Sequence, residues 1–197
     1  MLVLLIVVLV VAGIALFLLV RKRGDASAPA GPVDPFADKD SDALRGDPRA
    51  LKAGDIVDIF GETYTVRGSL RLKEGGYQWS EHLLDTAKGT RKWLSVEEDP
   101  DLELVLWTET PGVPAAGGDA IEYDGKTFQL DESGRAQYVS EATTGLTPSG
   151  TVAYHDYTAA DDTRLSFEDF GESGKKEAAI GQVLYRSAIM IYPQSSN

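Results

Sequence analysis

Residues 54–66 read GDIVDIFGETYTV, and residues 118–130 read GDAIEYDGKTFQL. The two stretches align without a gap: two glycines, an aspartate and a threonine are identical, and apolar residues replace one another at several positions between them. In both stretches apolar and polar residues alternate around a glycine turn, which is typical of a β-hairpin. We infer a tandem duplication, with halves at 51–110 and 118–192.

Strand signals continue through both halves. β-branched and aromatic residues alternate with polar ones, and glycines separate the runs. Residues 175–181 are the exception, because Lys-Lys-Glu-Ala-Ala-Ile-Gly favours one or two helical turns. The pattern predicts about five strands in each half, near 55–60, 63–72, 76–84, 91–97 and 102–108, then near 119–124, 126–131, 150–157, 163–169 and 182–192.

The expected fold is mainly β: a tandem pseudo-repeat of two antiparallel meanders, each of about five strands. Each half is near the lower size limit for an independent core, so we expect the halves to share one. The meanders would pack as two small barrel-like sheets, or close into a single sandwich or barrel.

The N-terminal segment has the sequence pattern of a membrane-spanning helix. Residues 2–20 contain no charged or strongly polar side chain, and three basic residues follow at 21–23. At about 1.5 Å per residue, such a helix nearly matches the hydrocarbon thickness of a bilayer. We therefore predict a transmembrane helix with a basic collar at 1–23, in contact with lipid through residues 2–20.

The flanking residues predict the topology. No basic residue precedes the apolar run and no small-residue cleavage site follows it, which disfavours a secretory signal. Basic residues on its C-terminal side predict a single-pass protein of the cell membrane, with the N-terminus outside and the soluble domain in the cytoplasm. A flexible, proline-rich linker is expected at 24–50, then a β-rich domain at 51–192 and a tail at 193–197.

Composition excludes several classes of function. The chain has 197 residues, no cysteine, two histidines and a formal net charge of -12. Disulfides and thiolate metal sites are therefore impossible, and binding to nucleic acid is disfavoured. Paired-histidine spacings and glycine-rich phosphate loops are also missing. We expect no metal, no cofactor and no nucleic acid.

Aromatic and acidic residues occur close together in the first half. Trp79, Glu81, Trp93 and Glu97 would form an acidic aromatic groove suited to a small cation or a basic peptide. In the competing interpretation the tryptophans fill a small β core. Acidic residues recur at 156 and 168, which fits either interpretation.

Three functions are compatible with these residues. The first is a non-catalytic binding or accessory module that engages a membrane-protein partner or a small cationic ligand. The second is an enzyme of unassigned reaction that uses Glu81, Glu97 or His82, although adjacent strand residues such as Glu81 and His82 point to opposite faces. The third is a structural scaffold. No nucleophile elbow or catalytic triad supports the enzyme, so we expect a binding module.

The chain resembles a bacterial family, DUF4178, over about residues 51–192. The resemblance is carried by these segments of the first half: Gly54-Asp55-Ile56-Val57, Tyr64-Thr65-Val66-Arg67-Gly68, Tyr77-Gln78-Trp79-Ser80-Glu81, Trp93-Leu94-Ser95-Val96-Glu97 and Leu106-Trp107. It implies a bacterial β-rich module and no particular activity. The second half lacks both tryptophans of these motifs, which would confine a tryptophan-based site to the first half.

Overall fold

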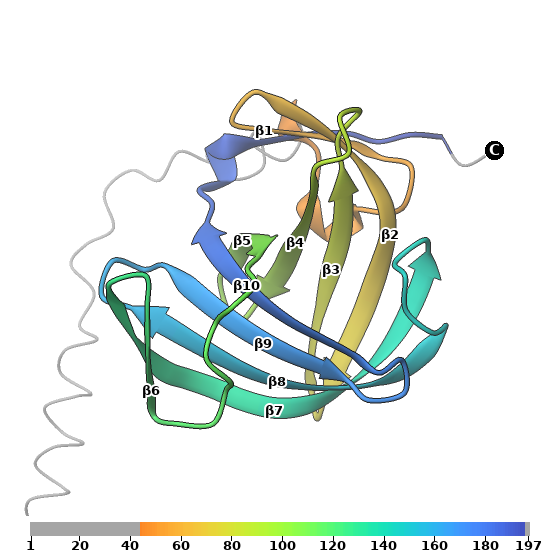
Figure 1. The fold of residues 1–197 in the computed structure, drawn as a ribbon. Helices are drawn as coiled ribbons and strands as arrows, with labels where there is room; N and C mark the ends of the chain where they lie inside the picture. Colours follow the sequence, from red (N-terminus) through yellow and green to blue (C-terminus); the bar gives the residue numbers. More distant parts are fainter. Residues whose placement is uncertain (1–43, 196–197) are drawn as a thin grey trace, which may run out of the picture. The chain divides into compact units, whose positions relative to one another are not determined.

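The computed structural model describes residues 44–195 (Figure 1). Within this range the chain folds into eleven antiparallel strands and two short 3-10 helices, η1 (Pro48–Ala50) and η2 (Arg186–Ala188). The strands are β1 (Ile56–Ile59), β2 (Glu62–Glu74), β3 (Tyr77–Asp85), β4 (Arg91–Glu98), β5 (Leu102–Glu109), β6 (Ala120–Tyr123), β7 (Lys126–Ala142), β8 (Ser149–Ala159), β9 (Arg164–Phe170), β10 (Lys175–Val183) and β11 (Ile189–Tyr192).

The strands close into a barrel. Their order in the sheet is β11-β1-β2-β3-β4-β5-β10-β9-β8-β7-β6, and a further pairing joins β2 to β7. That pairing makes a closed ring of eight strands, from β2 through β5 and from β10 back through β7. Strands β1, β11 and β6 lie outside the ring. The mainly β prediction is confirmed, and of the alternatives left open the closed barrel is the one observed.

Closure depends on β2 changing partner halfway along its length. Its first residues pair with β1, and residues Gly68–Lys73 pair with β7. The register of β2 against β3 shifts between Val66 and Gly68, which marks a bulge. A β-carbon on Gly68 would lie 2.6 Å from the carbonyl of Thr143, so only glycine allows the two strands to approach here.

The two halves contribute strands in the same order. Strands β1–β5 follow one another in the sheet, as do β6–β10, and the pairings β2–β7 and β5–β10 join the two sets. Both halves therefore share one closed barrel. The duplication inferred from the sequence stays a prediction.

The C-terminal region corrects two of our expectations. Residues 175–181, expected as helical turns, lie in strand β10, which pairs with β9 on one side and with β5 on the other. These pairings complete the barrel and override the local helix propensity. The single strand expected at 182–192 is divided between the end of β10 and β11, with η2 between them.

Three apolar clusters stabilise the fold. The first packs β1, β11 and the start of β2 against β3–β5, and includes Val57, Tyr64, Leu84, Leu94, Val96, Leu104, Leu106 and Ile191. The second lies between β2, β7, β8 and β9, and includes Leu70, Leu72, Ala136, Tyr138, Val152, Tyr154 and Phe170. The third joins β6 to the β7–β9 side of the barrel through Ile121, Phe128, Tyr157, Ala159 and Leu165.

The packed domain begins before residue 51. Pro48 in η1 and Leu51 are buried, and Arg49 pairs with Glu98 on β4 at 2.7 Å. The predicted membrane helix at 1–23 and the linker up to residue 43 lie outside the described residues. Among residues 44–195, no helix has the length and apolar character needed to cross a bilayer.

Candidate functional site

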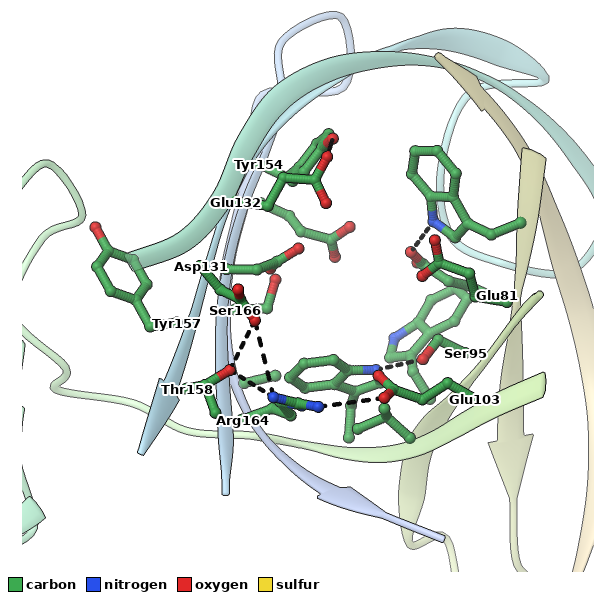
Figure 2. Close-up of a pocket in the computed structure, with 18 of the residues that line it drawn as sticks. Glu81, Ser95, Glu103, Asp131, Glu132, Tyr154, Tyr157, Thr158, Arg164 and Ser166 are labelled. Carbon is green, nitrogen blue, oxygen red and sulfur yellow. Dashed lines mark hydrogen bonds and ion pairs between the residues drawn. The ribbon is translucent and has the colours of Figure 1, made fainter. Parts of the chain in front are cut away.

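A cavity of about 700 Å³, partly open to solvent, lies between strands of both halves (Figure 2). Its walls come from β3, β4 and β5 on one side and from β7, β8, β9 and β10 on the other. Ten carboxylate side chains and three tryptophans line it, and Arg164 is the one basic residue among the lining side chains of the described chain. The cavity is therefore strongly acidic and partly aromatic.

The two-residue period of the strands sorts the side chains onto two faces. On β4, Trp93, Ser95 and Glu97 line the cavity, whereas Leu94 and Val96 point the other way, into the first apolar cluster. The same separation holds on the two neighbouring strands. Leu84 of β3, and Leu104 and Leu106 of β5, lie on the face opposite to the cavity residues of their strands. The apolar face of these strands thus packs outside the barrel and the polar face lines its interior.

All four residues proposed for the acidic aromatic groove line this one cavity. Trp79 and Glu81 reach it from β3, and Trp93 and Glu97 reach it from β4. The two tryptophans also pack against the second apolar cluster, so they serve the core and the cavity wall together. The geometry brings the four residues together, and their role in binding stays a prediction.

The second half supplies the opposite wall. Asp156 on β8, Glu168 on β9 and Glu177 on β10 face the same cavity as Glu81. The recurring acids at 156 and 168 noted in the sequence therefore join the acids of the first half. The cavity is built by both halves and not by the first half alone.

Three carboxylates, which we call the inner carboxylates, lie deep among the strands: Glu81, Asp156 and Glu168. Burial and repulsion from neighbouring carboxylates raise the pKa of Glu81 to about 7 and that of Asp156 to about 6. The same causes raise the pKa of Glu168 well above its ordinary value. Such shifts arise when like charges share a poorly solvated space.

The inner carboxylates have few partners. Glu81 accepts one hydrogen bond, at 3.1 Å, from the indole nitrogen of Trp79. Asp156 is hydrogen-bonded by Ser166, but its Oδ1 atom is buried without a partner. Glu168 has no ion pair within residues 44–195, because the nearby Lys175 pairs with Glu177. Negative charge in this part of the cavity is thus poorly compensated.

Four more exposed carboxylates, the rim carboxylates, are Glu97, Glu103, Asp131 and Glu132. Arg164 neutralises two of them: its guanidinium lies 3.2 Å from Glu103 and 3.8 Å from Asp131, and it donates to the Thr158 hydroxyl at 2.6 Å (Figure 2). Burial and repulsion from Glu132 and Glu103 raise the pKa of Glu97.

The aromatic side chains are held in fixed orientations. The rings of Trp79 and Tyr154 meet edge to face at 5.9 Å, and the Tyr154 hydroxyl donates to Glu74 at 2.6 Å. Trp107 donates to the Ser95 hydroxyl at 3.0 Å and lies against Gly181, where a β-carbon would come within 2.6 Å of its ring. These contacts give the cavity preformed walls.

His82 lies away from the cavity. It is fully buried and hydrogen-bonded to Ser69 and Ser80, and burial lowers its pKa to about 3, so it is neutral at physiological pH. Glu81 and His82 point to opposite faces of β3, as expected for adjacent strand residues. An enzyme that uses both residues at one centre therefore finds no support in this geometry.

The acids of the cavity do not converge on a metal ion. Among the described residues, no group of three or more histidine, aspartate or glutamate side chains is placed to hold one. The negative charge is instead distributed along the walls.

Most of the residues that line the cavity were not predicted as site residues from the sequence. The main omissions are Glu103, Trp107, Asp131, Glu132, Tyr154, Arg164 and Glu177. A usable signal was present on several strands, where polar or aromatic residues occupy every second position opposite an apolar set, as in Glu103 and Trp107 around Leu104 and Leu106. That alternation identifies the shared face but leaves open whether it faces the interior.

The fold and the site define a class of protein: a mainly β chain whose closed antiparallel barrel holds an acidic, aromatic-lined cavity. Residues 52–186 match the family described as "Domain of unknown function (DUF4178)". The chain therefore belongs to the DUF4178 family, and the resemblance seen in its motifs is confirmed.

Mycobacterial relatives match nearly the whole chain. The uncharacterized protein Rv2597 of Mycobacterium tuberculosis (strain ATCC 25618 / H37Rv) is 37% identical over 195 residues, which cover 95% of this chain and 89% of the relative. The uncharacterized protein Mb2628 of Mycobacterium bovis matches to the same extent. No solved structure matches the chain significantly.

Proposed function

We propose that this protein is a non-catalytic binding module that takes a small organic cation into the cavity of its barrel. The observation that carries the proposal is the set of inner carboxylates: Glu81 on one wall faces Asp156 and Glu168 on the other, and no basic side chain of residues 44–195 forms an ion pair with any of them. A bound cation would supply the missing positive charge.

The walls suit an organic cation. Ammonium groups are attracted both to carboxylates and to the faces of aromatic rings, and a partly enclosed site strengthens these interactions. Trp79 and Trp93 provide apolar surface beside Glu81 and Glu97. The exposed rim carboxylates place further negative charge where a ligand would enter, which favours the approach of cations.

The binding module is proposed to work at the membrane. The support is the apolar run at 2–20 followed by three basic residues, which predicts a single-pass anchor with its C-terminal side in the cytoplasm. The barrel would then present its cavity to the cytoplasm beside the bilayer.

The topology can be tested with a single introduced cysteine, because the chain has none. In an Asp101→Cys variant, we expect the protein to sediment with membranes and to react with a membrane-impermeant maleimide only after the cells are lysed. Labelling in intact cells would reverse the proposed orientation. Recovery in the soluble fraction would refute the anchor.

Cation binding can be tested by calorimetry on the full-length chain in detergent, with tetramethylammonium, n-butylamine and 1,4-diaminobutane as probes. We expect at least one probe to bind, with an affinity about tenfold weaker in a Glu168→Gln variant because one inner charge is lost. Asp101→Asn removes an exposed carboxylate outside the cavity and should bind like the natural chain. Failure of every probe to bind would overturn the proposal.

A further inference from the structure

The uncompensated carboxylates form a connected series from the inside of the cavity to its rim. Glu168 is an electrostatic neighbour of Glu81 and Asp156. Asp156 in turn neighbours Glu97 and Glu132 at the rim. The acids are therefore arranged along a path through the cavity and not around one point.

Strand geometry gives the spacing along this path. On one wall, Glu81 of β3 pairs with Ser95 of β4, and Glu97 lies two residues beyond Ser95. On the other wall, Glu168 of β9 pairs with Tyr154 of β8, and Asp156 lies two residues from Tyr154. Such diagonal neighbours on adjacent antiparallel strands lie about 7–8 Å apart. Each wall thus offers two carboxylate positions at about this spacing.

Three of the other lining acids already have cationic partners, which limits the sites open to a ligand. Arg164 pairs with Glu103 and Asp131, and Lys175 pairs with Glu177. Glu81 and Glu97 on one wall, and Glu168 and Asp156 on the other, keep negative charge without a cationic partner among residues 44–195. Glu74, Asp99 and Glu132 also lack an ion pair there, but Glu74 and Glu132 accept hydrogen bonds from the Tyr154 hydroxyl.

The aromatic residues do not form a cage for a compact cation. Trp79 is engaged edge to face with Tyr154, and Trp107 lies against Gly181. A quaternary ammonium site needs several ring faces that converge on one point. Here Trp79 and Trp93 instead provide apolar surface next to the series of carboxylates, which suits a methylene chain.

Resting on the proposed function, we infer that the ligand is a linear aliphatic diamine or polyamine held lengthwise in the cavity. One ammonium group binds between Glu81 and Glu168, and the next binds at Asp156 and Glu97. The methylenes between them pack against Trp79 and Trp93. Arg164, which already occupies the rim beside Glu103, restricts the ligand to the uncompensated side of the cavity.

The test compares ligands that differ only in their number of charges. By calorimetry on the full-length chain, 1,4-diaminobutane should bind at least tenfold more tightly than n-butylamine. Glu97→Gln, at an exposed position where folding is not at risk, should reduce that ratio to about threefold or less. Asp101→Asn should leave the ratio unchanged.

The outcomes separate this inference from the function on which it rests. If n-butylamine or tetramethylammonium binds as tightly as 1,4-diaminobutane, and Glu168→Gln weakens all three, then the cavity takes cations but the linear diamine is wrong. If the diamine preference is present but unaffected by Glu97→Gln, the proposed lengthwise placement is wrong. If nothing binds, the proposed function itself fails.

Discussion

Replacing Glu81 and Glu168 together by glutamine is expected to raise the free energy of unfolding by about 3 kcal/mol at pH 8. Neither side chain relies on its charge for a structural contact: the oxygen of a glutamine can still accept the hydrogen bond from Trp79, and Glu168 has no ion pair in the described chain. The change therefore removes repulsion without removing support. Melting temperature should rise by roughly 6–12 °C.

The gain should depend on pH in a definite direction. The pKa of Glu81 is raised to about 7 in the folded chain, against 4.5 for an unperturbed glutamate, and that of Glu168 is raised as well. Between these values the folded state holds more protons than the unfolded state, so stability falls as pH rises. The variant should match the natural chain near pH 4, and its advantage should grow through pH 5–7.

A control with the opposite sign is available. Hydrogen bonds from the Thr151 amide and hydroxyl lower the pKa of Glu172, which is exposed. Glu172→Gln should therefore give no gain in stability, and any loss should appear at pH 8 and not at pH 4. Chemical unfolding at both pH values measures all three chains. Equal stability of the double variant and the natural chain at pH 8 would contradict the crowding of charges in the cavity.

The expected gain in stability bears on why the inner carboxylates are present in the cavity. Residues selected only for folding would not leave two carboxylates facing one another in a poorly solvated space, because crowded like charges destabilise the folded state. Functional sites commonly keep residues that lower the stability of the folded state, because the function needs them. A measured gain would therefore favour the proposed ligand-binding role of the inner carboxylates over a purely structural one.

The strands could be predicted because their signals are local. Alternation of apolar and polar residues and the position of turn glycines, such as Gly61 and Gly125, define most strand boundaries. The main exception is β7, which was expected to end at residue 131 but continues to Ala142, where its last residues pair with β2. Strand β10 was missed because lysine, glutamate and alanine favour a helix locally. Its structure follows from its two neighbours: β9 precedes it across a short turn, whereas β5 lies far away in the sequence and no local signal announces that pairing.

The cavity could be predicted only in part for the same reason. Period-two alternation separates Trp93, Ser95 and Glu97 from Leu94 and Val96, but the usual rule would bury the apolar set inside the barrel. Here β1 and β11 cover the apolar face, and the pairing of β2 with β7 encloses the polar one. These are long-range pairings that the alternation within one strand does not contain.

The affinity of the cavity for 1,4-diaminobutane should fall at least about 100-fold between pH 8 and pH 5. Aliphatic amines, like the lysine side chain with a pKa near 10.4, stay charged over this range, so the change arises in the protein. Glu81 and Asp156, with pKa values of about 7 and 6, must lose their protons before they can bind an ammonium group. Below its pKa, each such group reduces affinity about tenfold per pH unit.

Calorimetry in buffers of different ionisation enthalpy would measure both the affinity and the protons released. Near pH 6, diamine binding should release protons, because a bound cation favours the charged carboxylates. Glu81→Gln removes the group that titrates near pH 7, so its affinity should be weaker at pH 8 and should change less between pH 8 and pH 5. If the natural chain bound the diamine equally at both pH values without proton release, the inner carboxylates could not be its site, and the ligand would have to bind at the rim, where Glu97 and Glu132 are more exposed.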